Sequence, residues 1–584
     1  MRSLLALRPY LARYRSKIAK GSVFIILANG FDSIYPLIVG AAVDALTTGH
    51  LSYSILTYAL AGIAMVGLRG IFLFLVSQNL LVLSLEVEND ISLVFFAHLL
   101  LFPKSFYNSR STGDIMAHAT NDIGNVRNFI GPGIMYSVQT ATRILFTLII
   151  LFSINPLVTV LALSPLPLIT FIVYKVGKAT FNRSLRVYEI FSDLTSKAQE
   201  CMSGIRVVKS YAREQNEADE FDRISDDYQQ KNLLLAKVQS FSFPMMFLLT
   251  SLSVIIVIYF GGIEVMKGKM TIGNISSFLV YLGQLTWPMI AFGWIINLVQ
   301  RAAPSMKRIM DIIETEPEIS DNSKTDYSVT ERDIEGDIEF RNVSFRYPLS
   351  SSDTLRNISL NIRKGTTLGI IGPTGSGKST LVNLIPRISD VTSGSVMLDG
   401  RDIRTIPLSV LRRSVGIVPQ ESFLFSDTIG NNIAYSAEFS DLTAAEEAAR
   451  SSGLYKDVDA FPKKFGTVLG ERGITLSGGQ KQRTTLARAL YMKPKILILD
   501  DSMSAVDTKT EEEILQELKK IMQGRTSIII THRISTVMSA NNIIVLDRGR
   551  IIEEGTHNEL LALKGIYFDI YQKQLLEEEI SGIE

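Results

Sequence analysis

A glycine-rich segment, GPTGSGKST (Gly372 to Thr380), has residue types and spacing suited to holding phosphate. It follows the apolar, strand-like run TTLGII and precedes the helix-like LVNLI, which is the context of a P-loop. Glycines let backbone amides turn toward phosphate oxygens, and the helix adds its positive N-terminal end. Lys378 is expected to reach the β and γ phosphates and Ser379 to ligate Mg²⁺. The residues expected to form this phosphate site are Gly372, Thr374, Gly375, Ser376, Gly377, Lys378, Ser379 and Thr380.

A second strand-like segment, ILILDD, ends in two carboxylates, Asp500 and Asp501. Asp500 lies 122 residues after Lys378. Asp500 at the end of a buried strand is suited to the Mg²⁺ shell, directly or through a bound water. By itself this pattern is weak, because two aspartates after a strand more often form a turn or a helix cap.

A third segment, LSGGQ, precedes the helix-like KQRTTLARAL. Ser477 can cap that helix, and the glycines permit a close approach of phosphate. The residues expected to contact nucleotide here are Leu476, Ser477, Gly478, Gly479 and Gln480.

Together these segments resemble the ATP-binding-cassette (ABC) family, and the resemblance covers the whole C-terminal domain. It implies adenine stacking on Tyr347 of FRYP, and Mg²⁺ and water sensing by Gln420 of VPQ. It implies further that Asp507 of SAVD lies in a dimer-contact loop and that His532 of ITHR faces the γ-phosphate. GERG (Gly470 to Gly473) looks like the segment that contacts the membrane domain in exporters.

One residue departs from the family pattern. Active members carry Glu after the strand aspartate, where it polarises the attacking water, whereas this chain has Asp501. The shorter side chain places its carboxylate roughly 1 to 1.5 Å too far away, and general-base catalysis requires hydrogen-bond contact. Hydrolysis at this site is therefore expected to be slow. The resemblance implies that two cassettes sandwich two ATPs between them. An intact LSGGQ beside a weak base therefore favours a heterodimer with a second half-transporter over a homodimer.

The N-terminal half predicts a membrane domain. Hydrophobic residues make up 47% and charged residues 20% of the chain, and the mean hydropathy is positive. Apolar stretches of about 20 residues can cross a bilayer. Six are found, near Ile18 to Val43, Ile55 to Leu85, Phe129 to Phe152, Leu157 to Val176, Phe243 to Met266 and Ile272 to Val299.

The distribution of lysine and arginine predicts the topology. Eighteen lie in the N-terminal segment and the two long internal connections, against only Lys267 and Lys269 in the opposite turns. Because cytoplasmic loops carry the excess, both termini are expected in the cytoplasm, at a bacterial inner membrane. The long connections look helical and are expected to project below the membrane to meet another domain.

The predicted architecture is a six-helix membrane domain followed by an α/β P-loop ATPase domain. The expected boundaries are 1–313 for the membrane domain, 314–335 for a polar linker, 336–575 for the ATPase domain and 576–584 for an acidic tail. Fusion of the two domains in this order resembles the exporter branch of the family. Near-equal numbers of basic and acidic residues, 59 and 58, argue against nucleic acid as a partner.

The expected function is ATP-driven export of an amphipathic small molecule, drug or lipid through the membrane. An ATP-gated channel or a nucleotide-sensing regulatory subunit of the same architecture is the alternative. Ionisable groups within membrane spans are expensive and are candidates for substrate contact. These candidates are Asp32, Arg69 and Arg143, together with Trp287 and Trp294, for which ordinary packing is the competing interpretation.

Overall fold

The computed structural model describes residues 2–49, 53–348, 350–437, 441–470, 473–501, 516 and 519–581. These residues form two compact units. The first comprises Met1–Leu99 and Gly113–Thr315, and it is helical. The second comprises Leu100–Thr112 and Glu316–Glu584, and it holds both β-sheets. The order, a helical unit followed by an α/β unit, is the one that the sequence predicts.

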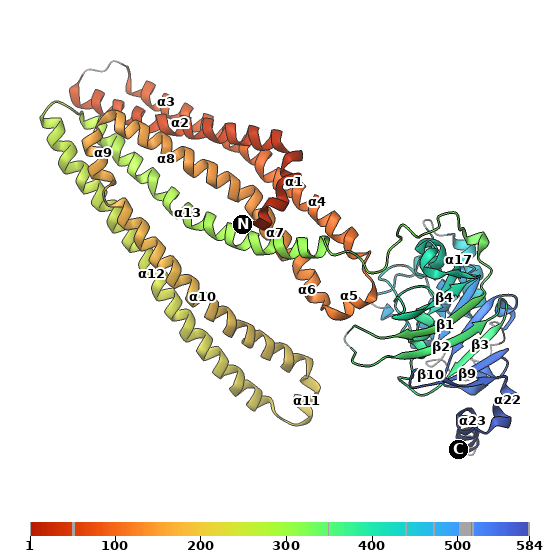
Figure 1. The fold of residues 1–584 in the computed structure, drawn as a ribbon. Coiled ribbons are helices and arrows are strands. Elements are labelled where there is room, and N and C mark those ends of the chain that lie inside the picture. The colour runs from red at the N-terminus through yellow and green to blue at the C-terminus, as the bar shows by residue number, and fades with distance from the viewer. Residues whose placement is uncertain are drawn as a thin grey trace. The chain divides into compact units, whose positions relative to one another are not determined.

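Long helices build the first unit (Figure 1). Three π-helical turns, Ser77–Leu81, His118–Asp122 and Phe129–Gly133, interrupt them without breaking their course. In chain order the helices of this unit are α1 (Arg8–Arg13), α2 (Arg15–Thr48), α3 (Ile55–Val76), α4 (Val82–Leu99), α6 (Thr112–Ala117), α7 (Ile123–Asn128), α8 (Ile134–Ile154), α9 (Pro156–Leu163), α10 (Leu166–Ser203), α11 (Ile205–Ser210), α12 (Glu214–Met266) and α13 (Ile272–Ile313).

Among the described residues, four helical stretches are long and apolar enough to cross a membrane. They are Arg15–Thr48, Ile55–Leu99, Thr112–Ile154 and Ile272–Ile313, and each contains one expected span. The other two expected spans lie on α9 and α10 and on the end of α12, where Thr250–Met266 is a shorter apolar helix. The count of six spans is thus not confirmed in full.

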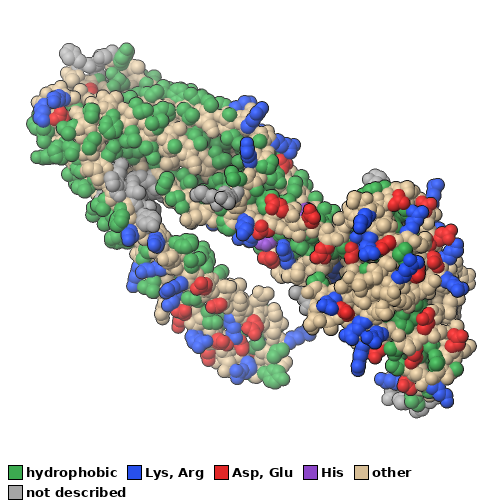
Figure 2. Space-filling view, viewed as in Figure 1, with side chains coloured by type: hydrophobic (Ala, Val, Ile, Leu, Met, Phe, Trp, Pro, Cys, Tyr) green, Lys and Arg blue, Asp and Glu red, His purple; other side chains and the backbone are tan. Residues whose placement is uncertain are grey.

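Surface chemistry separates the two ends of the helical unit. Figure 2 shows hydrophobic side chains covering α2, α3 and α8, whereas charged side chains gather on the parts of α10 and α12 near α11. Leu56, Ile63 and Phe74 of α3 are all more than half exposed. Such a continuous apolar exterior is expected where lipid replaces water. The helical internal connection predicted from the sequence corresponds to the charged ends of α10 and α12.

Helices α2 and α13 pack unusually closely at two glycines. A Cβ atom placed on Gly273 would lie 2.0 Å from the Gly40 carbonyl oxygen, and one on Gly40 would lie 2.6 Å from the Gly273 carbonyl oxygen. Ser277 Oγ donates to Pro36 O at 2.8 Å beside this contact. Small residues allow helix backbones to approach in a membrane, where packing and hydrogen bonds drive association.

The substitution Gly273→Ala is expected to destabilise the membrane domain by about 1–3 kcal/mol, because the added methyl group must push the backbone of α2 away. Gly283→Ala on the same helix is the matched control, since no atom of the described residues lies within 4 Å of its Cβ position. The control should be neutral or stabilise by about 0.5–1 kcal/mol, because alanine favours helix over glycine. Thermal denaturation of the full chain in lipid nanodiscs measures both. Equal midpoints for the two variants would contradict the close contact.

Two sheets organise the second unit. A four-stranded sheet has the order β2-β1-β4-β5, and a six-stranded sheet has the order β10-β9-β3-β8-β7-β6. In the larger sheet all neighbours are parallel except β10. The strands are β1 (Ile338–Phe345), β2 (Leu355–Ile362), β3 (Thr367–Ile371), β4 (Ser393–Leu398), β5 (Arg401–Asp402), β6 (Val415–Val418), β7 (Ile496–Asp500), β8 (Thr526–Ile530), β9 (Asn542–Asp547) and β10 (Arg550–Gly555).

The larger sheet is buried on both faces. One apolar cluster joins it to the smaller sheet and to α14, and a second cluster joins its other face to α16, α17 and α19. Parallel strands buried in this way are almost continuously apolar, as ILILD of β7 and TSIII of β8 are. The helices of this unit are α5 (Lys104–Ser109), α14 (Lys378–Asn383), α15 (Leu408–Ser414), α16 (Ile429–Ile433), α17 (Leu442–Ser451), α18 (Tyr455–Asp459), α19 (Gly478–Tyr491), α21 (Ile534–Val537), α22 (His557–Leu563) and α23 (Ile566–Ser581).

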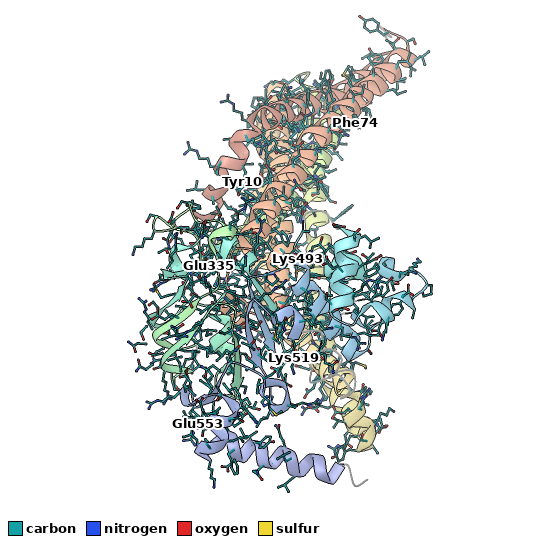
Figure 3. All side chains as sticks on the ribbon, turned by 90° about the vertical axis from the view of Figure 1, so that its right-hand side faces the viewer. Tyr10, Phe74, Glu335, Lys493, Lys519 and Glu553 are labelled. Atoms are coloured by element: carbon teal, nitrogen blue, oxygen red, sulfur yellow. The ribbon has the colours of Figure 1, made fainter. Side chains whose placement is uncertain are left out.

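A carboxylate fixes the C-terminal helix to the sheet. Glu553 on β10, labelled in Figure 3, accepts hydrogen bonds from the backbone amides of Ile566 and Tyr567 at the start of α23. The negative side chain satisfies amides that have no partner within the helix. Helix α23 continues to Ser581, so part of the expected acidic tail is helical.

Candidate nucleotide-binding site

The carboxyl ends of four neighbouring parallel strands meet at one edge of the larger sheet. The pairs Val418 with Leu499, Leu499 with Ile529, and Ile370 with Ile530 set their register. The segments that follow these strands contain the P-loop after β3, Gln420 after β6, Asp500 and Asp501 at the end of β7, and His532 after β8. Open α/β sheets bind ligands at this edge. The topology therefore gathers four of the sequence-predicted elements.

Three glycines give the P-loop a shape that other residues adopt with strain. Gly372, Gly375 and Gly377 have φ values of 152°, 80° and 104°. A Cβ atom on Gly372 would also lie 2.0 Å from the Leu546 carbonyl oxygen. The positive φ values turn backbone amides toward the space in front of α14, which begins at Lys378. The loop therefore has the form of an anion-binding cradle.

Lys378 is held inside this loop. Its Nζ donates to the carbonyl oxygens of Gly372 and Pro373, each at 2.9 Å, and the residue is buried. Burial lowers the pKa of the Lys378 ammonium, while the charges of Asp500 and Asp501 act to raise it. Carbonyl dipoles only partly replace the solvation that a buried ammonium loses. A phosphate group would supply the missing negative charge.

Ser376 provides an independent test of the fit to phosphate. Its Oγ is buried and has no hydrogen-bond partner among the described residues. The backbone of Ser376 is fixed by Gly549 N, which donates to its carbonyl at 3.1 Å. A buried hydroxyl without a partner costs free energy, and such groups call for an explanation. An oxygen of a bound phosphate would accept this hydrogen bond.

The pair of Ser379 and Asp500 has the chemistry of a magnesium site. Burial raises the pKa of the Asp500 carboxyl, and a hydrogen bond with Ser379 opposes that rise. Hydroxyl and carboxylate oxygens are ligands that Mg²⁺ accepts, and a cation would offset the cost of burying the carboxylate. Gln420 is exposed two residues beyond β6. These residues fit a magnesium ion that also contacts the nucleotide.

Asp501 has an unusual backbone. Its φ is +46°, and its amide donates to the Ile530 carbonyl at 2.9 Å. Aspartate occupies this region more often than most residues other than glycine. Nine other non-glycine residues among those described share it, so the conformation does not by itself mark a functional site. The sequence drew attention to the length of this side chain, whereas the left-handed backbone is visible only in the structure.

His532 is positioned by a residue that sequence reasoning missed. Gln574 on α23 donates from Nε2 to the His532 carbonyl and accepts at Oε1 from Ile534 N at 2.8 Å. One side chain thus joins the loop after β8 to the start of α21. Gln574 lies about forty residues after both partners in the sequence. No local pattern marks a glutamine in a C-terminal helix as a loop-positioning residue.

Tyr347 lies just beyond β1 and close to the P-loop. Its Oη and Thr380 Oγ1 are 3.0 Å apart, and its ring packs edge-on against Phe345 with centroids 4.8 Å apart. The side chain remains 38% exposed. An aromatic face beside the phosphate cradle is suited to stacking a nucleotide base.

The LSGGQ residues form a rigid turn whose hydrogen bonds lead to α18. Ser477 and Gln480 cap each other's backbone amides at the start of α19, and Gln480 Nε2 donates to Asp457 at 3.2 Å. Leu476 is buried, Gly478 is exposed and Gly479 is half-buried. The contacts of this turn do not involve the P-loop of the same chain in the part of the chain that the structure describes. Asp507 and residues 471–472 of GERG lie outside that part.

The three ionisable candidates of the membrane domain lie together. Asp32 on α2 forms ion pairs with Arg143 on α8 and, at 3.1 Å, with Arg69 on α3. Asp32 and Arg143 are buried, and the Arg69 side chain is 34% exposed. Pairing of this kind reduces the cost of charges within a membrane. Trp294 packs edge-on against Tyr136, and Trp287 is more than half exposed.

Comparison with known proteins places this architecture in a family. Residues 18–289 match the model of the ABC transporter transmembrane region, and residues 355–504 match the ABC transporter model of the ATPase domain. The chain belongs to the ABC transporter family. The family and the fold make it an ATP-hydrolysing membrane transporter of the exporter type, which confirms the resemblance seen in the sequence. Exporters of this kind work as dimers.

Individual relatives are similar along nearly the whole chain. The probable multidrug resistance ABC transporter ATP-binding/permease protein YheI of Bacillus subtilis is 36% identical, over 97% of this chain and 96% of its own length. The ATP-dependent lipid A-core flippase of Syntrophus aciditrophicus is 35% identical, over 82% of this chain and 78% of its own length. A solved bacterial Atm1-family ABC exporter with ATP bound has a TM-score of 0.80 at 25% identity, covering 96% of this chain and 99% of the other.

The substitution Ser376→Ala is expected to raise the stability of the nucleotide-free protein by about 1–3 kcal/mol, because it removes a buried hydroxyl that lacks a partner. It should also weaken ATP binding roughly tenfold, because a hydrogen bond to a charged phosphate is lost. Thermal denaturation with and without ATP measures both effects.

Ser527→Ala on β8 is the matched control, since Ser527 Oγ is likewise buried without a partner but lies near the amino end of its strand. It should stabilise the nucleotide-free protein and leave the stabilisation by ATP unchanged. If Ser376→Ala also leaves that stabilisation unchanged, the hydroxyl does not contact phosphate.

Proposed function

We propose that this chain is one half of a dimeric exporter that uses MgATP to move an amphipathic small molecule, drug or lipid across a bacterial inner membrane, with both termini in the cytoplasm. The observation that carries the proposal is the phosphate cradle around Lys378, with its unsatisfied Ser376 hydroxyl, in one chain with helices long enough to span a membrane. The eighteen basic residues on the proposed cytoplasmic side support the orientation.

The residues of the cradle divide the work of binding ATP. The loop amides and the start of α14 hold the phosphates, and Lys378 exchanges its carbonyl partners for phosphate oxygens. Ser379 and Asp500 would hold Mg²⁺, with Gln420 beside them, and the ion would neutralise charge that develops on the transferred phosphoryl group. Tyr347 stacks the base, and His532 faces the γ-phosphate.

Asp501 supports a dimer of two different chains. Its carboxylate is shorter than the glutamate usual in the family, so the attacking water is poorly polarised at this chain's own P-loop. The LSGGQ turn, in contrast, keeps its capping hydrogen bonds and presents Gly478 at the surface. A partner chain with a stronger base would use this turn to complete its own site. The pair would then have one hydrolytic site and one slow site.

The membrane domain supports an amphipathic cargo. YheI and MdlA are named as multidrug resistance proteins, and other relatives are named as lipid A-core flippases. Within this chain, Trp287 and Trp294 are the most exposed of the candidates, and the Arg69 side chain is 34% exposed although it pairs with Asp32. Asp32 and Arg143 are buried and pair with each other. An aromatic ring and a partly exposed guanidinium suit a cargo with both apolar and polar parts.

Steady-state MgATP turnover of the purified chain in lipid nanodiscs tests this proposal, with Lys378→Ala as the blank. The wild-type chain alone is expected to turn over near the blank, and Asp501→Glu is expected to raise turnover at least tenfold, since a placed general base contributes about 10²–10⁴-fold. Robust turnover by the wild-type chain alone would instead indicate a self-sufficient homodimer.

Transport itself needs a second measurement on the assembled dimer. ATP-dependent accumulation of a fluorescent amphiphile in inside-out vesicles is expected, and it should disappear when Lys378→Ala is introduced. A current that persists with a non-hydrolysable ATP analogue, without accumulation, would identify a channel and overturn export as the function.

A further inference from the structure

A cavity of about 290 Å³ opens beside Tyr347 in the second unit. The end of β1 and the following turn form one wall, and α14 with the turn after it forms another. The third wall is α5, together with Glu318 and Ile319. Helix α5 comes from the connection between α4 and α6 of the membrane domain, yet it belongs to the same compact unit as the two sheets.

The cavity is continuous with the P-loop. Thr380 is the last residue of the GPTGSGKST segment, and it lines the cavity together with Tyr347. The Tyr347 hydroxyl lies 3.0 Å from Thr380 Oγ1. A nucleotide whose phosphates rest on the P-loop amides therefore has its sugar and base directed toward Tyr347 and this cavity.

Helix α5 is tied to Glu318 by one hydrogen bond and is ordered by ring contacts within its own segment. Ser105 Oγ donates to Glu318 at 3.2 Å. The rings of Phe102 and Phe106 stack with centroids 3.9 Å apart, and the Arg110 guanidinium lies 4.5 Å from the centre of the Phe106 ring. These contacts order a helix of only six residues, which would not be stable alone. The side chains of α5 that line the cavity thus have a defined position.

Two of those side chains are free to meet a ligand. Lys104 and Asn108 line the cavity, and both are exposed. Charged groups on the opposite walls already have partners, since Arg346 pairs with Asp353 and Asp390 pairs with Arg387, each at 2.8 Å. An asparagine amide offers one donor and one acceptor, which matches the hydrogen-bonding edge of adenine. A lysine ammonium suits ribose hydroxyl and phosphate oxygens.

We propose that α5 forms one wall of the nucleotide-base pocket, with Asn108 on the edge of adenine and Lys104 on the ribose and its phosphate. This inference rests on the proposed function, namely ATP binding at the P-loop. ATP then links the membrane-domain connection to Tyr347 and α14 within one chain. Coupling between two sites is reciprocal, so ATP changes the docking equilibrium of α5 by the same factor as the docking of α5 changes ATP affinity. A movement of α4 and α6 that displaces α5 therefore changes ATP affinity by that factor.

Isothermal titration of the full chain in lipid nanodiscs tests this, in EDTA to prevent hydrolysis, with ATP and with inorganic tripolyphosphate as ligands. Asn108→Ala and Lys104→Met are each expected to weaken ATP binding by roughly 3- to 10-fold, the effect of one lost hydrogen bond. Asn108→Ala should leave tripolyphosphate affinity unchanged, because that ligand has no base. Ser109→Ala is the matched control, since Ser109 lies on α5 and, among the described residues, its hydroxyl donates to the Phe106 carbonyl alone.

The outcomes separate this inference from the proposed function. If Asn108→Ala binds ATP as the wild-type chain does, α5 does not contact the base, although ATP binding itself stands. If Asn108→Ala weakens the binding of ATP and of tripolyphosphate equally, Asn108 only supports the local fold, and the inference is also wrong. If wild-type ATP binding is absent or insensitive to Lys378→Ala, the proposed function fails first.

Discussion

The parallel pairing of β3, β8, β7 and β6 is the constraint on which the nucleotide site depends. It brings the P-loop, Gln420, the β7 carboxylates and His532 to one edge of a sheet, although up to 160 residues separate them in sequence. Buried apolar strands hold that register, since a slip of one residue would reverse every side chain. Gln574 extends the arrangement by tying α23 to the loop of His532. Fold and site therefore have the same stabilising core.

Burial makes this edge respond to ligand. It lowers the pKa of Lys378 and raises that of Asp500, so each charge is disfavoured in the free protein. The Ser376 hydroxyl lacks a partner, and Asp501 has a left-handed backbone. Each feature costs free energy without nucleotide, and phosphate and a cation relieve the electrostatic part. Binding energy is thus concentrated where the proposed chemistry occurs.

Several buried polar groups of the membrane domain have partners within it, although the Thr147 hydroxyl on α8 has none among the described residues. Asp32 pairs with two arginines on neighbouring helices, and Gly40 and Gly273 let two helix backbones touch. Hydropathy predicted six spans, and four of them lie on helices that are long and apolar enough to cross a membrane in the described part of the chain. The helices run well beyond the expected spans, as α12 does over 53 residues. Hydropathy detects the part that lipid covers, whereas hydrogen bonding continues the helix past it.

The sequence alone determined the class of protein, the order of its domains and most residues of the candidate site, because P-loop chemistry requires particular residues at fixed spacing. It also marked Asp501 as a departure. The sequence also predicted that the internal connections meet another domain, as α5 does. The ion pairing of Asp32, the orphan hydroxyl of Ser376 and the bridging by Gln574 were decided only by tertiary structure. Each depends on contacts between segments distant in the chain, and no local periodicity or propensity encodes which distant segment a side chain will meet.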